Sequence, residues 1–511
     1  MTRLHCDAWL LPTDDWMSTA GDFTTVIEAA EAQKDIEPWA DEEQFRALPT
    51  SDAADPQVWL GRIGGLDQPA SWYADCAEQF IEAAAASAHV RGASGRAVPL
   101  LAMPVLGTRY GGGRWDEKGQ ILEALIERIR SAARTRDVDV VLVTWGEDAA
   151  RSRAMYAAAQ RARQRVLAAT PDVADWDLGP NTPALEDAAV RLAGLARSGR
   201  LVLFLGAGVS AGAGLPTWQH LIDELARAAD LDEDSIESLH RFDLRDQATI
   251  VMQDSDDGRD QIVQALDTAH YPLTGALLAS LPTTEAITTN YDGLFEAAVE
   301  ACHQDLVVLP YSAVSEAGQR WLLKLHGSVG RSGVDIVLTR DDYLAAPSRH
   351  AALFGLVQAM LLTRHMLFVG YSLGDEDFHK IVHEVRTAQS SASEGGGSVL
   401  GSALVLADDP LQARLWSGTI SVVPTGPRVT IGDDGDAESV AVAARTLQIF
   451  LDRVAFLAAD MTGFLLDPDF AGLLNESERK VAEGLSNLAG LAVGDQALAE
   501  KLRDLLRRFG G

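Results

Sequence analysis

Cysteine, positive charge and long apolar runs are all scarce in this sequence. Its 511 residues include only three cysteines, Cys6, Cys76 and Cys302, and their wide spacing excludes a disulfide framework and a C-x-x-C redox pair. Scarce, unpaired cysteine is typical of a reducing cytoplasm, which is where we expect this protein. The longest apolar stretch, 351–362, contains Gln358 and is too short to span a bilayer.

Basic residues are outnumbered by acidic ones. Lys and Arg total 43 against 74 Asp and Glu, which gives a formal net charge of −31. This charge would repel a phosphate backbone, so we expect no nucleic acid partner. Asp7, Asp14 and Asp15 stand near the N-terminus in place of a basic and then apolar leader, so neither export nor a membrane anchor is predicted.

The most informative stretch is RLVLFLGAGVSAGAGLPTW, residues 200–218. It opens with an apolar run typical of a buried strand, continues through four glycines, and turns to helical spacing at Trp218. Glycines let the backbone approach an anion, and N–H groups at a helix start favour negative charge. The stretch therefore predicts a phosphate-binding strand, turn and helix, with Thr217 as the helix N-cap.

Three other interpretations of the glycine loop stay open. G-x-G-x-x-A from residue 206 permits a dehydrogenase fingerprint, although that motif needs a second strand ending in an acid about 20 residues later. GVSAG also fits a G-x-S-x-G nucleophile elbow, with Ser210, Asp292 and His326 available as a triad. The glycines could also serve only a tight turn and close packing.

Three strand-like segments downstream end in polar clusters: TTNYD at 288–292, KLHGS at 324–328 and GYSLGDED at 370–377. Open α/β sheets bind their ligands at the carboxyl ends of the strands. We therefore expect these clusters and the glycine loop to gather at one edge of one sheet.

GAGVSAGAGLPTW, TTNYD, KLHG and GYSLGDED, in this order, resemble the sirtuin-like domain of bacterial anti-phage effectors of the Thoeris NADase type. The resemblance covers 186–458. It implies a Rossmann-type parallel sheet with a helical insertion, and cleavage of NAD⁺ into nicotinamide and ADP-ribose. Deacylating sirtuins differ, because 327–511 lacks the cysteines of their zinc module and Thr217-Trp218-Gln219 replaces their Asp-Phe-Arg triplet. No metal is expected.

The resemblance also implies roles for individual residues. Asn290 would orient the ribose and the attacking water, His326 would act as general base, and Asp292 would support the nicotinamide end or the turn carrying Asn290. NAD⁺, as substrate, would be held by a further set: Gly206, Ala207, Gly208, Ser210, Gly214, Thr289, Gly370, Ser372 and Asp375. Structural roles stay open beside these, as a strand-end cap for Asn290, a helix N-cap for Asp292 and a core position for His326.

Residues 1–165 alternate strands and helices and so predict a second α/β domain. Strands are expected at 7–11, 97–103 and 138–144, with an acidic stretch lacking any predicted element between 12 and 70. Asp7 and the glycine loop 107–113 resemble parts of a macro domain, which implies an ADP-ribose-type signal as ligand. The family's asparagine pair is replaced here by Pro12-Thr13-Asp14, and an interaction domain is the alternative.

The remaining segments complete the predicted organisation. Pro, Asp and Gly residues at 166–185 predict a linker, and 459–511 predict a C-terminal helical segment. The resemblance implies an NADase of low basal activity, regulated as an anti-phage effector and acting as a homo-oligomer or with a defence partner protein. The alternative is a non-catalytic NAD or ADP-ribose sensor that recruits a partner.

Overall fold

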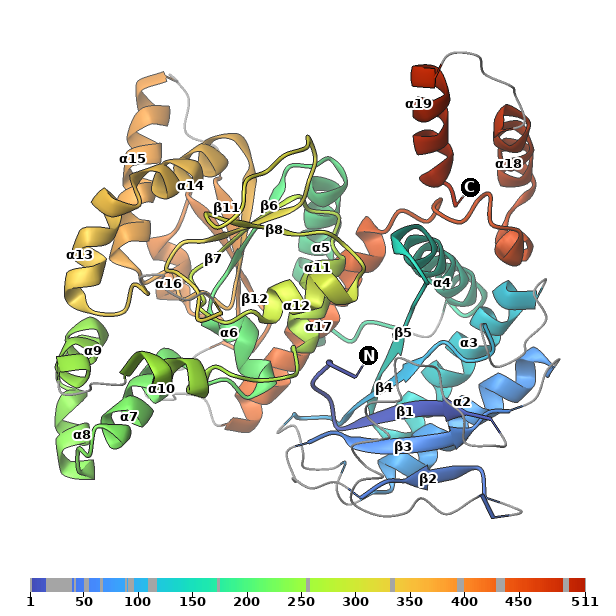
Figure 1. The fold of residues 1–511 in the computed structure, drawn as a ribbon, viewed down its shortest axis with the longest axis horizontal. Helices are drawn as coiled ribbons and strands as arrows, with labels where there is room; N and C mark the ends of the chain where they lie inside the picture. Colours follow the sequence, from blue (N-terminus) through green and yellow to red (C-terminus); the bar gives the residue numbers. More distant parts are fainter. Residues whose placement is uncertain are drawn as a thin grey trace. The chain divides into compact units, whose positions relative to one another are not determined.

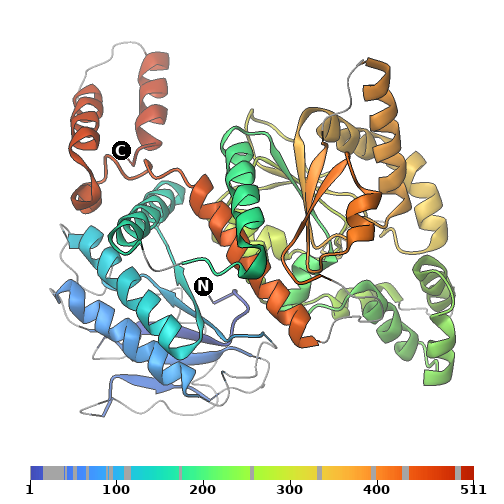
Figure 2. The same ribbon diagram turned by 180° about the vertical axis from the view of Figure 1, so that it is seen from behind.

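The computed structural model describes residues 2–14, 39–40, 43–49, 55–64, 68–87, 90, 96–108, 117–171, 175–253, 258–330, 336–392, 399–428, 437–489 and 496–510. The chain forms two compact units, Met1–Asp175 with Ala459–Gly511, and Trp176–Ala458. Each unit is built on its own mainly parallel sheet covered by helices (Figures 1 and 2).

The first unit contains a five-stranded sheet in the order β2-β3-β1-β4-β5. Its strands are β1 Ala8–Thr13, β2 Phe45–Ala47, β3 Gln57–Arg62, β4 Leu100–Pro104 and β5 Asp139–Val143. The β2–β3 pair is antiparallel and the other pairs are parallel. β2 and β3 are not among the predicted strands, because β2 has three residues and a glycine interrupts the apolar pattern of β3.

Three long helices, α2 Ala70–Ala85, α3 Lys118–Arg136 and α4 Ala149–Ala169, belong to this unit. The end of the chain packs on them through η4 Pro468–Leu473, followed by α18 Glu476–Ala489 and α19 Gln496–Arg507. Phe464, Phe470 and Leu473 share an apolar cluster with α3 and α4. Lys118 Nζ lies 2.5 Å from the Asp469 carboxylate, which ties the segment to the start of α3.

Two features that suggested a macro domain lie in this unit. Asp7 is 1% exposed, and its carboxylate accepts the Leu100 backbone N–H at 2.6 Å, so this group already has a partner inside the sheet. Gly107 has a φ of +73° and packs against the Tyr73 ring, whereas the rest of the predicted loop, 109–113, lies outside the described residues. The macro-like fold and its ligand stay predictions.

The second unit contains a seven-stranded, fully parallel sheet in the order β12-β11-β10-β6-β7-β9-β8. Its strands are β6 Leu201–Leu205, β7 Glu285–Thr288, β8 Val307–Leu309, β9 Trp321–Lys324, β10 His365–Val369, β11 Gly401–Val405 and β12 Ile420–Pro424. The chain leaves β6 toward β7 and later returns to β10 on its other side. The topological switch point, where such sheets bind ligands, therefore lies between β6 and β10.

Helices cover both faces of this sheet (Figure 2). One face carries α5 Thr182–Arg197, α11 Leu273–Ser280, α12 Leu294–Ala301 and α17 Ala437–Ala458. The other carries α13 Arg340–Arg349, α14 Ala351–Thr363, α15 Glu376–Ala392 and α16 Pro410–Leu415. α16 is not among the predicted helices, because it is only six residues long.

The helical insertion between β6 and β7 begins with α7 Trp218–Ala228, α8 Glu233–Leu239, α9 Leu244–Gln253 and α10 Gly258–Ala265. Leu225, Val251 and Ile262 are among the residues of its own apolar cluster, which Ile336 and Leu338 complete from beyond β9. Thr217 stands at the N-cap position of α7, as predicted, although its side chain makes no cap hydrogen bond. The predicted fold class, a parallel α/β sheet with a helical insertion after another α/β unit, is confirmed.

Across the part of the chain that the structure describes, no helix combines the length and apolar character needed to cross a bilayer.

Candidate active site

Two glycine-containing loops interlock at the switch point. A Cβ on Gly206 would lie 2.4 Å from the Gly370 carbonyl oxygen, and one on Gly370 would lie 2.3 Å from the Val209 nitrogen. Gly370 also has a φ of +64°, a conformation that favours glycine. Glycine is therefore required at both positions so that the turn after β6 can contact the turn after β10.

Backbone N–H groups of the glycine loop already have acceptors within the protein. Gly206 N–H donates to Val369 O at 3.0 Å, and Gly208 N–H donates to Gly370 O at 2.9 Å. Val209 N–H donates to Gly206 O at 3.0 Å. A phosphate contact through the Gly206 and Gly208 N–H groups would therefore require the two turns to separate, and the predicted phosphate site stays a prediction.

Asn290, Ser210 and Asp292 form one hydrogen-bonded group beside the glycine loop. The Asn290 amide donates to Gly206 O at 3.0 Å and to Ser210 Oγ at 3.2 Å. Ser210 Oγ donates in turn to the Asp292 carboxylate at 2.8 Å. The other Asp292 oxygen accepts the N–H of Leu294, the first residue of α12, at 3.0 Å. The N-cap position itself is Gly293, so the N-cap alternative for Asp292 is wrong, although its carboxylate does bind the start of the helix.

A buried lysine holds the turn that carries Asn290 and Asp292. Lys324 is 1% exposed, and its Nζ donates to the backbone carbonyls of Asn290 and Asp292. The same ammonium lies 2.9 Å from the Glu296 carboxylate. Buried charges need such partners, because an uncompensated ammonium in the interior is costly. This lysine stands within the KLHG motif, but the resemblance implies no role for it.

His326 lies beyond the end of β9, two residues after Lys324, just as Asn290 lies two residues after Thr288 on β7. Since Thr288 pairs with Lys324 in register, both side chains stand at the same level of the sheet edge. His326 is 3% exposed, and no hydrogen bond joins its ring to Asn290 or to another described side chain. The structure thus brings the two predicted catalytic residues to neighbouring strand ends without direct contact.

The environment of His326 is aromatic and buried. Its ring meets the Tyr343 ring edge-on with centroids 5.2 Å apart, and Tyr343 stacks on Trp218 at 5.7 Å. Burial is the larger effect on the pKa of His326 and lowers it to about 4. The negative charge of Asp375 acts in the opposite direction and raises this pKa by a smaller amount. The imidazole is therefore neutral at pH 7 and able to accept a hydrogen bond. Tyr343 is not among the predicted site residues, because it lies outside the four motifs.

The other predicted ligand-contacting residues surround the same edge. Thr289 donates its N–H to Leu205 O at 3.3 Å, and Gly214 ends its turn with a φ of +80°. Ser372 is exposed and its hydroxyl accepts the Gly374 N–H at 3.3 Å. Asp375 accepts the Asp377 N–H at 2.9 Å at the start of α15, and together with burial it raises the pKa of Asp377 to about 6. Asp375 thus has a structural contact besides its effect on His326.

The geometry argues against two of the alternative interpretations. Ser210 donates to Asp292 instead of to His326, so a Ser-His-Asp triad is not formed and the nucleophile elbow is excluded. A dehydrogenase fingerprint is excluded because helices α7 to α11 separate β6 from the next strand, β7. The close packing of the glycines, the third alternative, is present.

A small cavity lies under the hydrogen-bonded group, bordered by Ser210, Asn290, Lys324 and Phe295. Its volume is about 10 Å³, which is room for about one water and not for a nucleotide. Ala207 and Gly208 are exposed, and Asn290, whose amide contacts Gly206 O, is half-buried. We call this accessible side the rim of the glycine loop, and a ligand would approach from it.

No cluster of three or more His, Cys, Asp or Glu side chains with metal-binding geometry occurs among the described residues.

Residues 284–419 match the SIR2-like domain family. The matched span includes the turn after β7, the turn after β9 and the turn after β10, and so contains Asn290, His326 and Gly370. The glycine loop after β6 precedes it. The match supports the sirtuin-like domain that the four motifs predict.

Curated relatives are similar over a comparable part of the chain. "Defense-associated sirtuin 2" of Bacillus subtilis is 27% identical over 207 residues, covering 38% of this chain and 20% of that protein. "NAD(+) hydrolase ThsA" of Enterococcus faecium is 29% identical over 198 residues, covering 37% of this chain and 40% of that protein. The protein of the same name from Bacillus cereus (strain MSX-D12) is 28% identical over 197 residues, covering 36% of this chain and 40% of that protein. The matches span only a fifth to two fifths of these relatives.

Proposed function

We propose that this protein is an NAD⁺ hydrolase and acts as a regulated anti-phage effector that depletes NAD⁺. The observation that supports this most is the placement of Asn290 and the neutral His326 at adjacent strand ends beside the β6–β10 switch point. The names of the relatives, a defence-associated sirtuin and two NAD⁺ hydrolases, support the same substrate and setting.

The reaction needs little acid catalysis. The bond between ribose C1′ and the nicotinamide nitrogen breaks, and the electron pair leaves with nicotinamide, which becomes neutral. Water adds to C1′ and loses a proton, so that NAD⁺ and water yield nicotinamide, ADP-ribose and H⁺. A site for this reaction must orient the water and stabilise the positive ribose while excluding bulk solvent.

The described residues fit these needs. The Asn290 amide, fixed by Gly206 and Ser210, would present its oxygen to the ribose or the water. His326, kept neutral by burial, would accept a proton through a ribose hydroxyl or a water. Gly206, Ala207, Gly208 and Gly214 would face the phosphates once the turn after β10 moves away, and Gly370, Ser372 and Asp375 belong to that moving turn.

The requirement for this movement is consistent with low basal activity. Gly208 N–H is engaged by Gly370 O, and the cavity beside Asn290 admits about one water. An activating signal would favour the separated form of the two turns, by binding that form more tightly than the closed one.

Nicotinamide release from NAD⁺ tests the assignment. We expect purified protein to release nicotinamide, and Asn290→Ala and His326→Ala to lower the rate by at least about 10²-fold, the scale of removing a general base or an oriented contact. His220→Ala, at an exposed position of α7, is the matched control and should keep the wild-type rate. Unchanged release in both site variants would overturn the assignment. NAD⁺ binding without release under any activating condition would favour the sensor alternative.

A further inference from the structure

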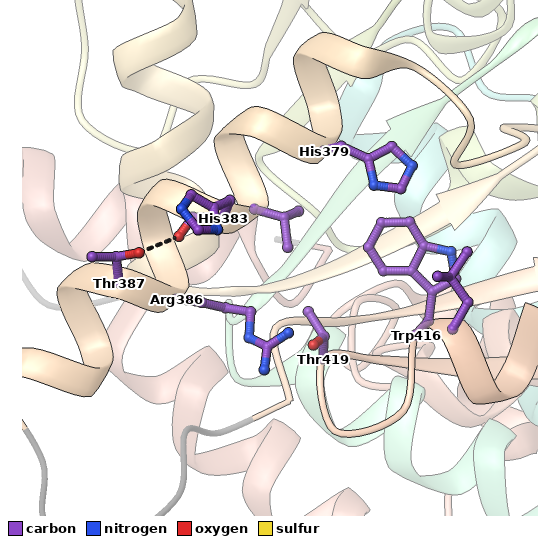
Figure 3. Close-up of a pocket in the computed structure, with 8 residues that line it drawn as sticks. His379, His383, Arg386, Thr387, Trp416 and Thr419 are labelled. Carbon is purple, nitrogen blue, oxygen red and sulfur yellow. Dashed lines mark hydrogen bonds between the residues drawn. The ribbon is translucent and has the colours of Figure 1, made fainter.

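A second recess lies on the Trp176–Ala458 unit, between α15 and the segment joining α16 to β12 (Figure 3). Its cavity volume is about 670 Å³, within the usual range of small-molecule sites. None of the described residues that line it belongs to the candidate active site. We call this recess the α15–α16 groove.

The groove is basic in an acidic protein. The chain carries 74 Asp and Glu, yet the titratable side chains among the described lining residues are His379, His383 and Arg386. These three positions follow i, i+4 and i+7 on α15, so they share one face of the helix. A local group of cationic and N–H donor side chains attracts anions even where the net charge of the protein is negative.

An apolar wall faces these donors. The Trp416 ring is 5% exposed and lies 4.9 Å from the His379 ring, with the planes at 28°. Val382 lines the groove from α15, and Leu415, 70% exposed, lines it from α16. Flat organic groups stack on such surfaces.

The wall is held rigid from below. Trp416 contacts Phe378 with centroids 5.9 Å apart, and Phe378 packs at 5.0 Å against Phe368 of the central strand β10. A ligand would meet a surface already in place, which reduces the ordering cost of binding. Figure 3 shows the Arg386 guanidinium extending toward Thr419 at the opposite side of the groove.

We propose that the α15–α16 groove is a binding site for a small planar organic anion. The flat part of the ligand lies against Leu415 and the exposed His379 ring, which Trp416 supports from behind. Its phosphate or carboxylate meets Arg386, whose guanidinium forms paired hydrogen bonds with either group. The site is separate from the glycine loop, so the proposal does not depend on NAD⁺ cleavage.

Calorimetric titration of the full-length protein tests the proposal, with AMP as the planar phosphate and benzoate as the planar carboxylate. Saturable binding of either one is expected, and comparison of the two identifies the preferred acidic group. Arg386→Ala should weaken binding at least tenfold. Arg349→Ala, an exposed arginine at the end of α13, is the matched control and should bind as the wild type does.

A second variant distinguishes loss of ligand binding from loss of folding. Leu415→Glu places a carboxylate in the groove at a largely exposed position, so it should fold normally and still weaken binding at least tenfold. The proposal is overturned if neither probe binds saturably, or if binding persists unchanged in Arg386→Ala and Leu415→Glu. Persistent binding of AMP in both variants would assign it to another site, such as the rim of the glycine loop.

Discussion

The Ser210 hydroxyl and the Asp292 carboxylate form a buried hydrogen bond of 2.8 Å across 82 residues of sequence. Ser210 also accepts from the Asn290 amide, so it fixes the side chain proposed to orient the ribose and the water. The bond joins the turn after β6 to the turn after β7. Loss of this bond should therefore disturb the position of Asn290 more than it disturbs the sheet.

Ser210→Ala should lower nicotinamide release by about 10²-fold, because a small displacement of an orienting group has effects of that size. The free energy of unfolding should fall by about 1.5–3 kcal/mol, the scale of a hydrogen bond to a charged group. Ser402→Ala is the control. It removes a buried serine that is hydrogen-bonded to His365 at 3.0 Å on β10, and it should cost stability without a comparable loss of rate. Equal losses of rate in both variants would contradict the positioning role.

Lys324→Met should destabilise the protein by about 3–5 kcal/mol, because it leaves the Glu296 carboxylate without its buried partner. In Lys324→Met/Glu296→Gln no uncompensated charge remains, so much of that stability should return. Nicotinamide release should not return, because the carbonyls of Asn290 and Asp292 still lack their donor. Denaturant unfolding and rate measurements on the same preparations check both parts. Recovery of rate together with stability would show that Lys324 acts only through the fold.

The strand, glycine turn and helix at 200–218 could be predicted because each signal is local: an apolar run, closely spaced glycines and helical periodicity. The gathering of Asn290, His326 and Gly370 at one edge followed from strand order in parallel sheets. The burial of Lys324 could not be predicted, because its hydrogen-bond partners are backbone carbonyls in the turn after β7, a segment distant in the sequence. Nor could the sequence show that Gly370 O occupies the Gly208 N–H, which depends on the contact between two turns far apart in the chain.

Gly370→Ala should lower the free energy of unfolding by at least about 3 kcal/mol relative to the wild type. A positive φ costs about 1–2 kcal/mol for a residue with a Cβ, and the new methyl would also press on the Val209 backbone 2.3 Å away. Gly418→Ala is the matched control, because Gly418 has a φ of +74° and nothing lies within 4 Å of an added Cβ. This variant should therefore lose only the free energy that the positive φ costs. Urea unfolding measures the difference. Equal losses would mean that the two turns separate at little cost.

His326 should make the protein less stable in acid. Its pKa is about 4 in the folded protein against an ordinary value of 6.5, so the unfolded chain binds the proton first. Stability from this group is therefore complete above pH 6.5 and falls as the pH drops toward 4. Between pH 7 and pH 4.5 the loss should be about 2–3 kcal/mol. Asp377 has the opposite sign, because its raised pKa of about 6 makes the folded form bind a proton first.

Comparison with His326→Gln isolates the histidine, since Asp377 titrates in both proteins. The free energy of unfolding of the wild type should fall more steeply than that of the variant between pH 7 and pH 4.5, by the same 2–3 kcal/mol. Urea unfolding at half-unit pH steps provides the two curves. Because the imidazole stays predominantly neutral across this range, nicotinamide release by folded wild-type protein should not show a step near pH 6.5. Parallel stability curves, or a histidine-like step in the rate near pH 6.5, would place His326 in contact with solvent instead of in its buried position beside Tyr343.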